Sequence, residues 1–133
     1  MLFHDSGNKF PCACCGYRVN TMPPGYHETC PICGWEDDLS QLRFVDMPGS
    51  SNRVSLRNAQ INFIEYGTSE KRGLVDVRQP YQDDTRDDDW RPVDPSIDNI
   101  EQPTSGIDYA SSYPLDTTQL YYWRHTYWRR IVG

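Results

Sequence analysis

The five cysteines of this 133-residue chain all lie between positions 12 and 33. Cys12 and Cys15 form one C-x-x-C pair, and Cys30 and Cys33 form a second pair after fourteen intervening residues. Two pairs at this separation are typical of a site in which four thiolates bind one metal ion tetrahedrally. A glycine follows each pair, which favours tight turns whose backbone amides point toward the sulfurs. The spacing therefore predicts one structural metal site with these four cysteines as its ligands.

Zinc is the metal that we expect at this site, and iron is the alternative. A tetrahedral site of four sulfurs accepts either metal, and C-x-x-C-G-Y followed by C-P-I-C-G also resembles the knuckles of rubredoxins. We favour zinc because the intervening loop is shorter than in rubredoxins and no redox module accompanies it. The odd number of cysteines argues against disulfides, and the Pro- and Gly-rich surroundings argue against a redox C-x-x-C.

The fifth cysteine, Cys14, lies inside the first turn at the position where the second turn has Ile32. We therefore expect its thiol to point away from the metal as a small, buried or half-exposed group. Four cysteines also leave no open position for a catalytic water. Because the sequence has only three histidines, no Gly-rich phosphate loop and no nucleophile elbow, we expect a protein that is not an enzyme.

The surrounding segments must hold the two cysteine pairs together. The Pro-Pro-Gly run at 23–25 predicts a loop or short hairpin that returns the second pair to the first. A helix is predicted over 55–66, with Ser55 as its N-cap and Gly67 at its C-terminal end. Residues 73–80 predict a short strand or extended segment. The expected fold is a small α+β domain stabilised by zinc, with a knuckle- or ribbon-like N-terminal part.

Residues 117–131 are predicted to form an amphipathic helix. Asp116 and Gln119 have the spacing of a capping box, and apolar residues recur at helical spacing from Leu120 onward. We expect this stripe to complete the core. Aromatic residues on the other faces are candidates for contact with a partner, since Tyr and Trp are enriched in binding hot spots. These are Tyr121, Tyr122 and Trp128.

The net charge of −6 is concentrated in residues 83–116, which carry ten acids against two bases. Four prolines and the lack of any sustained period predict a long irregular loop there. A negative field of this kind repels nucleic acid and favours a basic protein as partner. The residues that we expect to contact that partner are Asp83, Asp84, Asp87, Asp88, Asp89 and Trp90.

Length and hydropathy predict a single domain over 1–133, since a chain of this size forms one core. The first ten residues do not show a basic segment followed by an apolar run, as a signal peptide would. No stretch approaches the ~20 apolar residues needed to span a bilayer. We therefore expect a soluble, cytoplasmic protein that does not contact membranes.

Several separated blocks of the sequence resemble the bacterial cysteine-rich CPCC family. They are F-P-C-A-C-C-G-Y, C-P-I-C-G-W-E-D-D with Gln41 after it, and then Asn52, Ser55-Leu56, Ala59, Asn62-Phe63 and Gly67. The resemblance covers residues 10–80 and departs at Ala13, where the family has proline, without removing a ligand. It implies a small zinc-binding domain, and some members of the family serve as immunity proteins beside bacterial toxins.

The expected function is a non-enzymatic, zinc-stabilised protein-binding module, an immunity protein that neutralises a cognate bacterial toxin by direct binding. A rubredoxin-like iron electron carrier is one alternative. A zinc-ribbon adaptor for nucleic acid is another, for which Arg124, Arg129 and Arg130 are the only local support.

Overall fold

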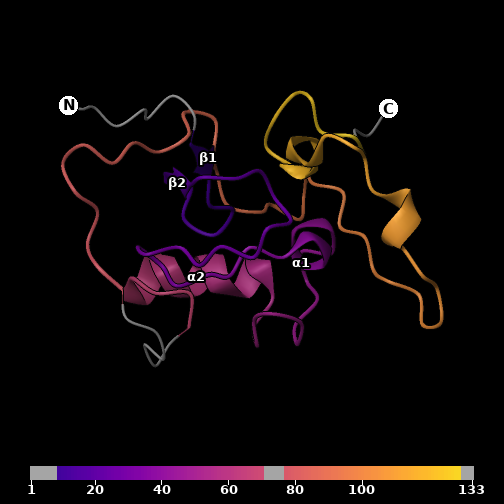
Figure 1. Cartoon of the computed structure of the whole chain (residues 1–133). Helices are drawn as coiled ribbons and strands as arrows, with labels where there is room; N and C mark the ends of the chain where they lie inside the picture. Colours follow the sequence, from indigo (N-terminus) through magenta and orange to yellow (C-terminus); the bar gives the residue numbers. More distant parts are fainter. Residues whose placement is uncertain (1–8, 71–76, 130–133) are drawn as a thin grey trace.

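A computed structural model of the chain describes residues 9–70 and 77–129. Its regular elements are a two-stranded antiparallel sheet and two α-helices, with most of the chain between them irregular (Figure 1). These elements are β1 (Phe10–Pro11), β2 (Arg18–Asn20), α1 (Leu39–Arg43), α2 (Leu56–Tyr66) and the 3-10 helices η2 (Ala110–Ser112) and η3 (Thr117–Leu120). The prediction of a small α+β domain is confirmed. Within the described ranges, no helix has the length and apolar character needed to cross a membrane.

Helix α2 forms where its capping residues predict it. The Ser55 side chain accepts a hydrogen bond from the Asn58 amide, and Gly67 ends the helix in the left-handed conformation at φ 81°. The buried face of the helix consists of Leu56, Ala59 and Gln60. The N-terminal half of the helix therefore packs against the core, and two of its buried side chains are apolar while one is an amide.

Helix α1 and the segment after it are joined through a buried amide, Gln41, which is 0% exposed. Its Nε2 atom donates to the carbonyl oxygens of Met47, Asn52 and Val54, and its Oε1 atom accepts from the Asn52 backbone and side-chain amides. Asp38 caps the helix by accepting from the amides of Ser40 and Gln41. The 47–54 segment has no regular structure of its own, so these hydrogen bonds determine its path.

Arg43, at the end of α1, anchors the irregular segment that follows residue 100. The side chain is 3% exposed, and its guanidinium donates to both carboxylate oxygens of Glu101 and to the Ser112 hydroxyl. Four aromatic rings surround its Cζ atom at 4.8–5.1 Å: Phe44, Tyr109, Tyr113 and Trp128. Because a planar guanidinium can fork a carboxylate and stack on rings at once, this arginine serves as a hub of the fold.

The predicted helix over 117–131 is wrong for the part that the structure describes. Only η3 forms, with Asp116 capping it, and the chain then continues through turns to residue 129 (Figure 1). Leu120, Tyr121, Tyr122 and Trp123 are four successive buried residues. A helix would bury only one side of such a run, whereas the observed irregular backbone buries all four. The end of the predicted helix, residues 130 and 131, lies outside the described residues.

The short strand or extended segment predicted over 73–80 falls partly on residues 71–76, which lie outside the described residues. Its remaining part, 77–80, contains no strand. The predicted irregular character of 83–116 is confirmed, apart from the single turn of η2.

Candidate metal centre

The two C-x-x-C pairs lie in turns with the same backbone hydrogen bonds. In the first turn, Cys12 N donates to Tyr17 O and Gly16 N donates to Cys12 O, at 2.9 and 2.7 Å. The second turn repeats this pattern from Cys30, whose amide donates to Trp35 O and whose carbonyl accepts from Gly34 N. Both turns need a glycine in the left-handed conformation, since Gly16 and Gly34 have φ of 82° and 85°. The glycine that follows each cysteine pair therefore allows a tight turn, as predicted.

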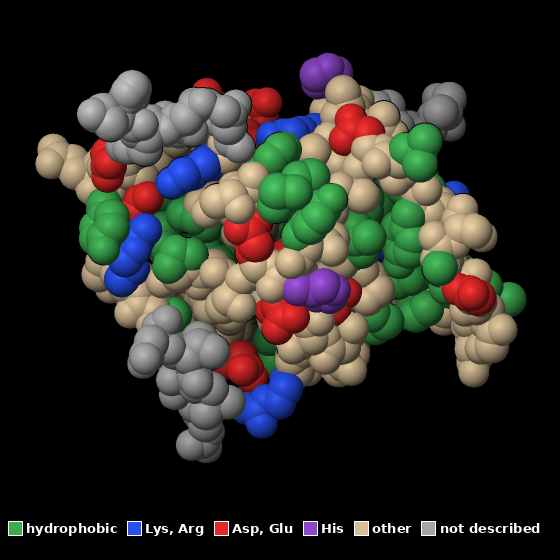
Figure 2. All heavy atoms as spheres, in the orientation of Figure 1, with side chains coloured by type: hydrophobic (Ala, Val, Ile, Leu, Met, Phe, Trp, Pro, Cys, Tyr) green, Lys and Arg blue, Asp and Glu red, His purple; other side chains and the backbone are tan. Residues whose placement is uncertain are grey.

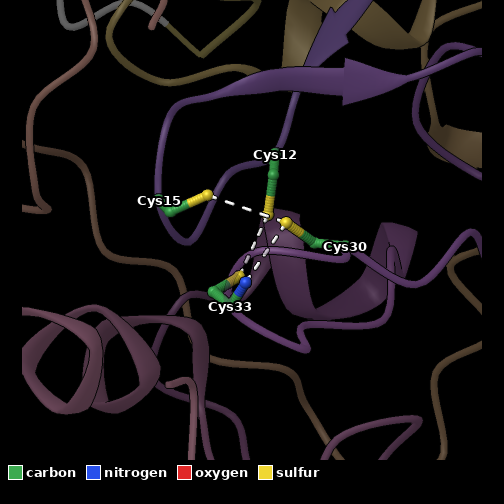
Figure 3. A group of neighbouring side chains, drawn as sticks. All are labelled: Cys12, Cys15, Cys30 and Cys33. Carbon is green, nitrogen blue, oxygen red and sulfur yellow. Dashed lines mark hydrogen bonds between the residues drawn. The ribbon is translucent and has the colours of Figure 1, made fainter. Parts of the chain in front are cut away.

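The four predicted ligands converge from the two facing turns (Figure 3). Their sulfur atoms all lie within 4.8 Å of one another, and the Cys12–Cys33 and Cys15–Cys30 pairs are 3.6 and 3.7 Å apart. Metal–sulfur bonds of about 2.3 Å in a tetrahedron place sulfurs about 3.8 Å apart. Disulfides are excluded, because all five cysteines are free and a disulfide requires about 2.05 Å. The sulfur positions fit a four-coordinate metal ion.

The polar surroundings of the sulfurs also fit such an ion. In the second turn, the amides of Ile32 and Cys33 donate to Cys30 Sγ, and the Trp35 amide donates to Cys33 Sγ, each at 3.4 Å. Burial raises the pKa of the Cys12 and Cys33 thiols well above the ordinary value. A bound cation would offset that cost, and its binding would release protons.

A comparison with protein-family models supports this arrangement. The model for "Cysteine-rich CPCC" matches residues 10–84, which is more than half of the chain and includes both turns. The chain belongs to the cysteine-rich CPCC family. Comparisons with curated proteins and with solved structures gave no significant match.

Two polar residues after the second cysteine turn belong to the sequence blocks that resemble the family. Gln41 and Asn52, which are part of the resemblance, are hydrogen-bonded to each other, and Asn52 also exchanges hydrogen bonds with the backbone of Glu36. The CPCC resemblance thus extends from the candidate metal ligands to the amide network that supports the second turn.

Cys14 is fully buried and is not part of the four-sulfur cluster. The structure therefore agrees with the prediction that four of the five thiols are candidate ligands and that the fifth is a buried side chain. Within the described residues, the only cluster of three or more metal-binding side chains consists of these four cysteines.

The sequence did not predict that residues after 84 cover the first cysteine turn. The Trp90 ring lies against Gly16 so closely that a Cβ atom there would be 2.7 Å from it. Trp90 Nε1 donates to Ala13 O at 2.9 Å, and Arg86 Nε donates to Cys15 O at 2.7 Å. Trp90 was expected to face a partner, but its indole is used to close this turn. The sequence around an aromatic residue next to acids does not show whether its side chain contacts a partner or packs inside the protein.

Buried tyrosines and Gln60 complete this cover. Tyr121, 1% exposed, donates from its hydroxyl to Pro11 O at 3.0 Å. Gln60 Nε2 donates to Ala13 O at 3.0 Å and to the hydroxyl of Tyr122 at 2.9 Å. The prediction that Tyr121 and Tyr122 face a partner is therefore wrong, because both rings belong to the core. Trp128 is half-buried and packs on the Arg43 guanidinium.

Most acids of the 83–116 tract have partners inside the protein. Asp84 pairs with Arg78, and this contact lowers the pKa of the Asp84 carboxyl. Asp87 is 6% exposed and pairs with Arg124 at 2.8 Å; burial would raise the pKa of Asp87, but Arg124 lowers it below its usual value. Arginines also pair with Asp98 and Glu101, and backbone amides donate to Asp94, Asp108 and Asp116.

Of the acids predicted to bind a partner, Asp83, Asp88 and Asp89 are exposed. On the face seen in Figure 2, acidic side chains are scattered among neutral and hydrophobic ones. The acidic side chains of the protein therefore do not form one continuous patch on this face.

Proposed function

We propose that this protein is a non-enzymatic protein-binding module whose fold is stabilised by one zinc ion. The observation that carries this proposal is the buried cluster of four cysteines, whose side chains are at most 2% exposed. Four sulfur ligands fill a tetrahedral shell, so no position remains for a substrate or a catalytic water. Zinc suits this shell because it prefers tetrahedral thiolate sites and has no redox chemistry.

Metal analysis of the purified protein tests the choice of zinc. We expect one zinc per chain and a colourless solution. A red protein with thiolate-to-iron absorption would instead support the rubredoxin-like alternative. Because the two turns are held together by the ligands, removal of the metal with a strong chelator should unfold at least residues 10–40. Hydrogen exchange followed by mass spectrometry would locate that change.

Two observations favour a scaffold over an enzyme. The metal-ligand cluster found among the described residues contains cysteines only. His27 is paired with Glu36 at the surface, and His125 is exposed. Among the described residues, neither histidine is hydrogen-bonded to a nucleophilic side chain, as a hydrolytic site would need.

Within this class, we propose an immunity protein that binds a basic toxin directly. The support is the net charge of −6 and the resemblance to CPCC proteins that accompany toxins. Co-expression with the product of the neighbouring gene tests this proposal, since the protein should restore growth and co-purify with that product. Growth inhibition that persists despite folded, zinc-loaded protein would contradict it.

A nucleic-acid adaptor has less support. Arg124 pairs with Asp87, and Arg129 lies 3.6 Å from Glu101, so the charges of both arginines are compensated locally. Arg130 lies outside the described residues. Binding to DNA or RNA that weakens steeply with salt would favour the adaptor over the protein-binding module.

A further inference from the structure

The loop that joins the two cysteine turns carries exposed apolar side chains. Tyr26 is 58% exposed and Met22 is 40% exposed, although most of the described aromatic residues are buried or half-buried. His27, beside them, has a side chain that is 58% exposed and a φ of 58°, which makes it the only described non-glycine residue with positive φ. A strained backbone and exposed Tyr and Met side chains often occur together where a loop binds a partner.

The backbone of this loop is held rigidly by two carboxylates. Glu28 accepts hydrogen bonds from the amides of Thr21 and Met22 and from the Thr21 hydroxyl, at 2.8–3.1 Å. Oδ2 of Asp37 accepts from three successive amides, Gly25 to His27, at 2.7–3.2 Å. Such a loop loses little conformational entropy when a partner binds, so the contacts of its exposed side chains contribute more of their energy to affinity.

The segment that contains this loop is acidic. Residues 21–38 contain Glu28, Glu36, Asp37 and Asp38 but no Lys or Arg. Four thiolates around a divalent ion would add a formal charge of about −2 at the two turns that the loop joins. Arg78 donates its backbone amide to Pro31 O, and its guanidinium is paired with Asp84. Glu28 and Asp37 accept hydrogen bonds from backbone amides, and Glu36 is paired with His27. Among the described residues, no Lys or Arg side chain forms an ion pair with these three carboxylates.

A hollow of about 340 Å³ adjoins the loop, and its lining is both polar and apolar. The polar lining residues are His27, Asp38, Ser40, Ser50, Ser51 and Tyr113. Asp38 is 5% exposed, and its carboxylate already accepts hydrogen bonds from Ser40, Gln41 and Ser51. The acceptors that the hollow offers to a Lys or Arg side chain are therefore hydroxyl groups.

We propose that loop 21–27 and this hollow form the docking surface for a basic protein partner. An apolar surface of the partner receives Tyr26 and Met22, and one of its Lys or Arg side chains enters the hollow. This inference rests on the proposed protein-binding function, and it assigns the contact to the loop between the cysteine turns instead of the 83–89 acids.

Site-specific photo-cross-linking in the native host cell tests the assignment with the 133-residue, zinc-loaded chain. The photoreactive residue p-benzoylphenylalanine replaces one exposed residue at a time, as Tyr26→p-benzoylphenylalanine, Asp88→p-benzoylphenylalanine or Ile64→p-benzoylphenylalanine. We expect one basic protein to be cross-linked from position 26 and not from position 64. Cross-linking from position 88 or 64 but not from 26 overturns the docking surface and leaves the protein-binding function standing. If no protein is cross-linked from any position, both proposals fail.

Affinity measurements with the cross-linked partner, purified, provide the quantitative test. Tyr26→Ala should weaken binding about 10-fold or more, since an exposed tyrosine on a rigid loop is a typical hot spot. Tyr81→Ala is the matched control, because Tyr81 is 62% exposed and lies beside the acidic tract. It should change the affinity less than about 2-fold. Equal losses in both variants, or a loss only for Tyr81→Ala, would refute the docking surface. Retention of zinc and of the thermal midpoint in both variants confirms that the fold is unchanged.

Discussion

Gln60→Leu is the substitution that most directly tests whether the second half of the chain supports the first cysteine turn. Gln60 is 1% exposed, and its amide joins three segments: Ala13 in the turn, Val93 and Tyr122. Leucine nearly preserves the volume but removes all three hydrogen bonds. The Val93 amide then loses its partner in a buried position, whereas Ala13 O keeps Trp90 Nε1 as a donor.

The expected loss follows from these contacts. Each intramolecular hydrogen bond contributes about 1 kcal/mol, and an unsatisfied buried amide costs about 1–3 kcal/mol. We therefore expect the free energy of unfolding to fall by about 2–4 kcal/mol, which lowers the midpoint of thermal unfolding by about 10 °C for a chain of this length. Asn58→Ala is the control on the same helix, because Asn58 is exposed and its substitution should cost less than about 0.5 kcal/mol.

Denaturant unfolding in excess zinc measures both variants under the same metal saturation. If Gln60→Leu costs no more than the control, residues 60, 93 and 122 do not form a buried connection to the turn, and our account of its cover is wrong. A large loss accompanied by faster zinc release would show in addition that this connection holds the ligands in place.

Three other perturbations have distinct expected outcomes. Cys30→Ser should abolish metal binding and unfold the cysteine turns, whereas Cys14→Ser should retain one metal per chain, as metal analysis and circular dichroism would show. Asp87→Asn breaks a buried ion pair and should destabilise the fold by about 1–3 kcal/mol, while Asp88→Asn should change it by less than about 0.5 kcal/mol in thermal denaturation. Burial would raise the pKa of Asp38, but hydrogen bonds from neighbouring serines lower it well below its usual value. The contribution of the Asp38 carboxylate to stability is complete above the unfolded-state pKa of about 4 and is lost as pH falls through the folded-state pKa. Asp38→Asn should therefore have a lower free energy of unfolding at pH 7. That free energy should also fall less steeply from pH 5 to pH 2 than in the unsubstituted protein.

Features specified by short-range sequence rules were predictable. The spacing of Cys12, Cys15, Cys30 and Cys33 identified the cluster, because two tight turns place two sulfurs each on a common side. Ser55 and Gly67 identified the ends of α2, since capping depends on the few residues around each terminus. In both cases the deciding interactions join residues close together in the chain.

The cover of the first turn was not predictable in this way. Trp90 bonds to Ala13 across 77 positions, and Tyr121 bonds to Pro11 across 110. In these contacts a side chain donates to a backbone carbonyl. Hydrophobic periodicity and the residue types of the partner segment therefore do not predict them. The apolar residues at 120, 123 and 127 matched a helical period, yet burial of four consecutive residues required an irregular backbone.

The internal pairing of the 83–116 acids also changes how a charge-reversal experiment must be designed. Reversal of all five aspartates between 83 and 89 would place a lysine at Asp87, next to the Arg124 guanidinium in a buried position. The protein would then lose binding through unfolding, whether or not the tract contacts a partner. Reversal limited to Asp88 and Asp89, which are exposed, changes the charge by the same sign and leaves that ion pair intact. The partner would be assigned to the tract instead of the loop at 21–27 only if this second variant no longer protects cells against the toxin while its midpoint of thermal unfolding is unchanged.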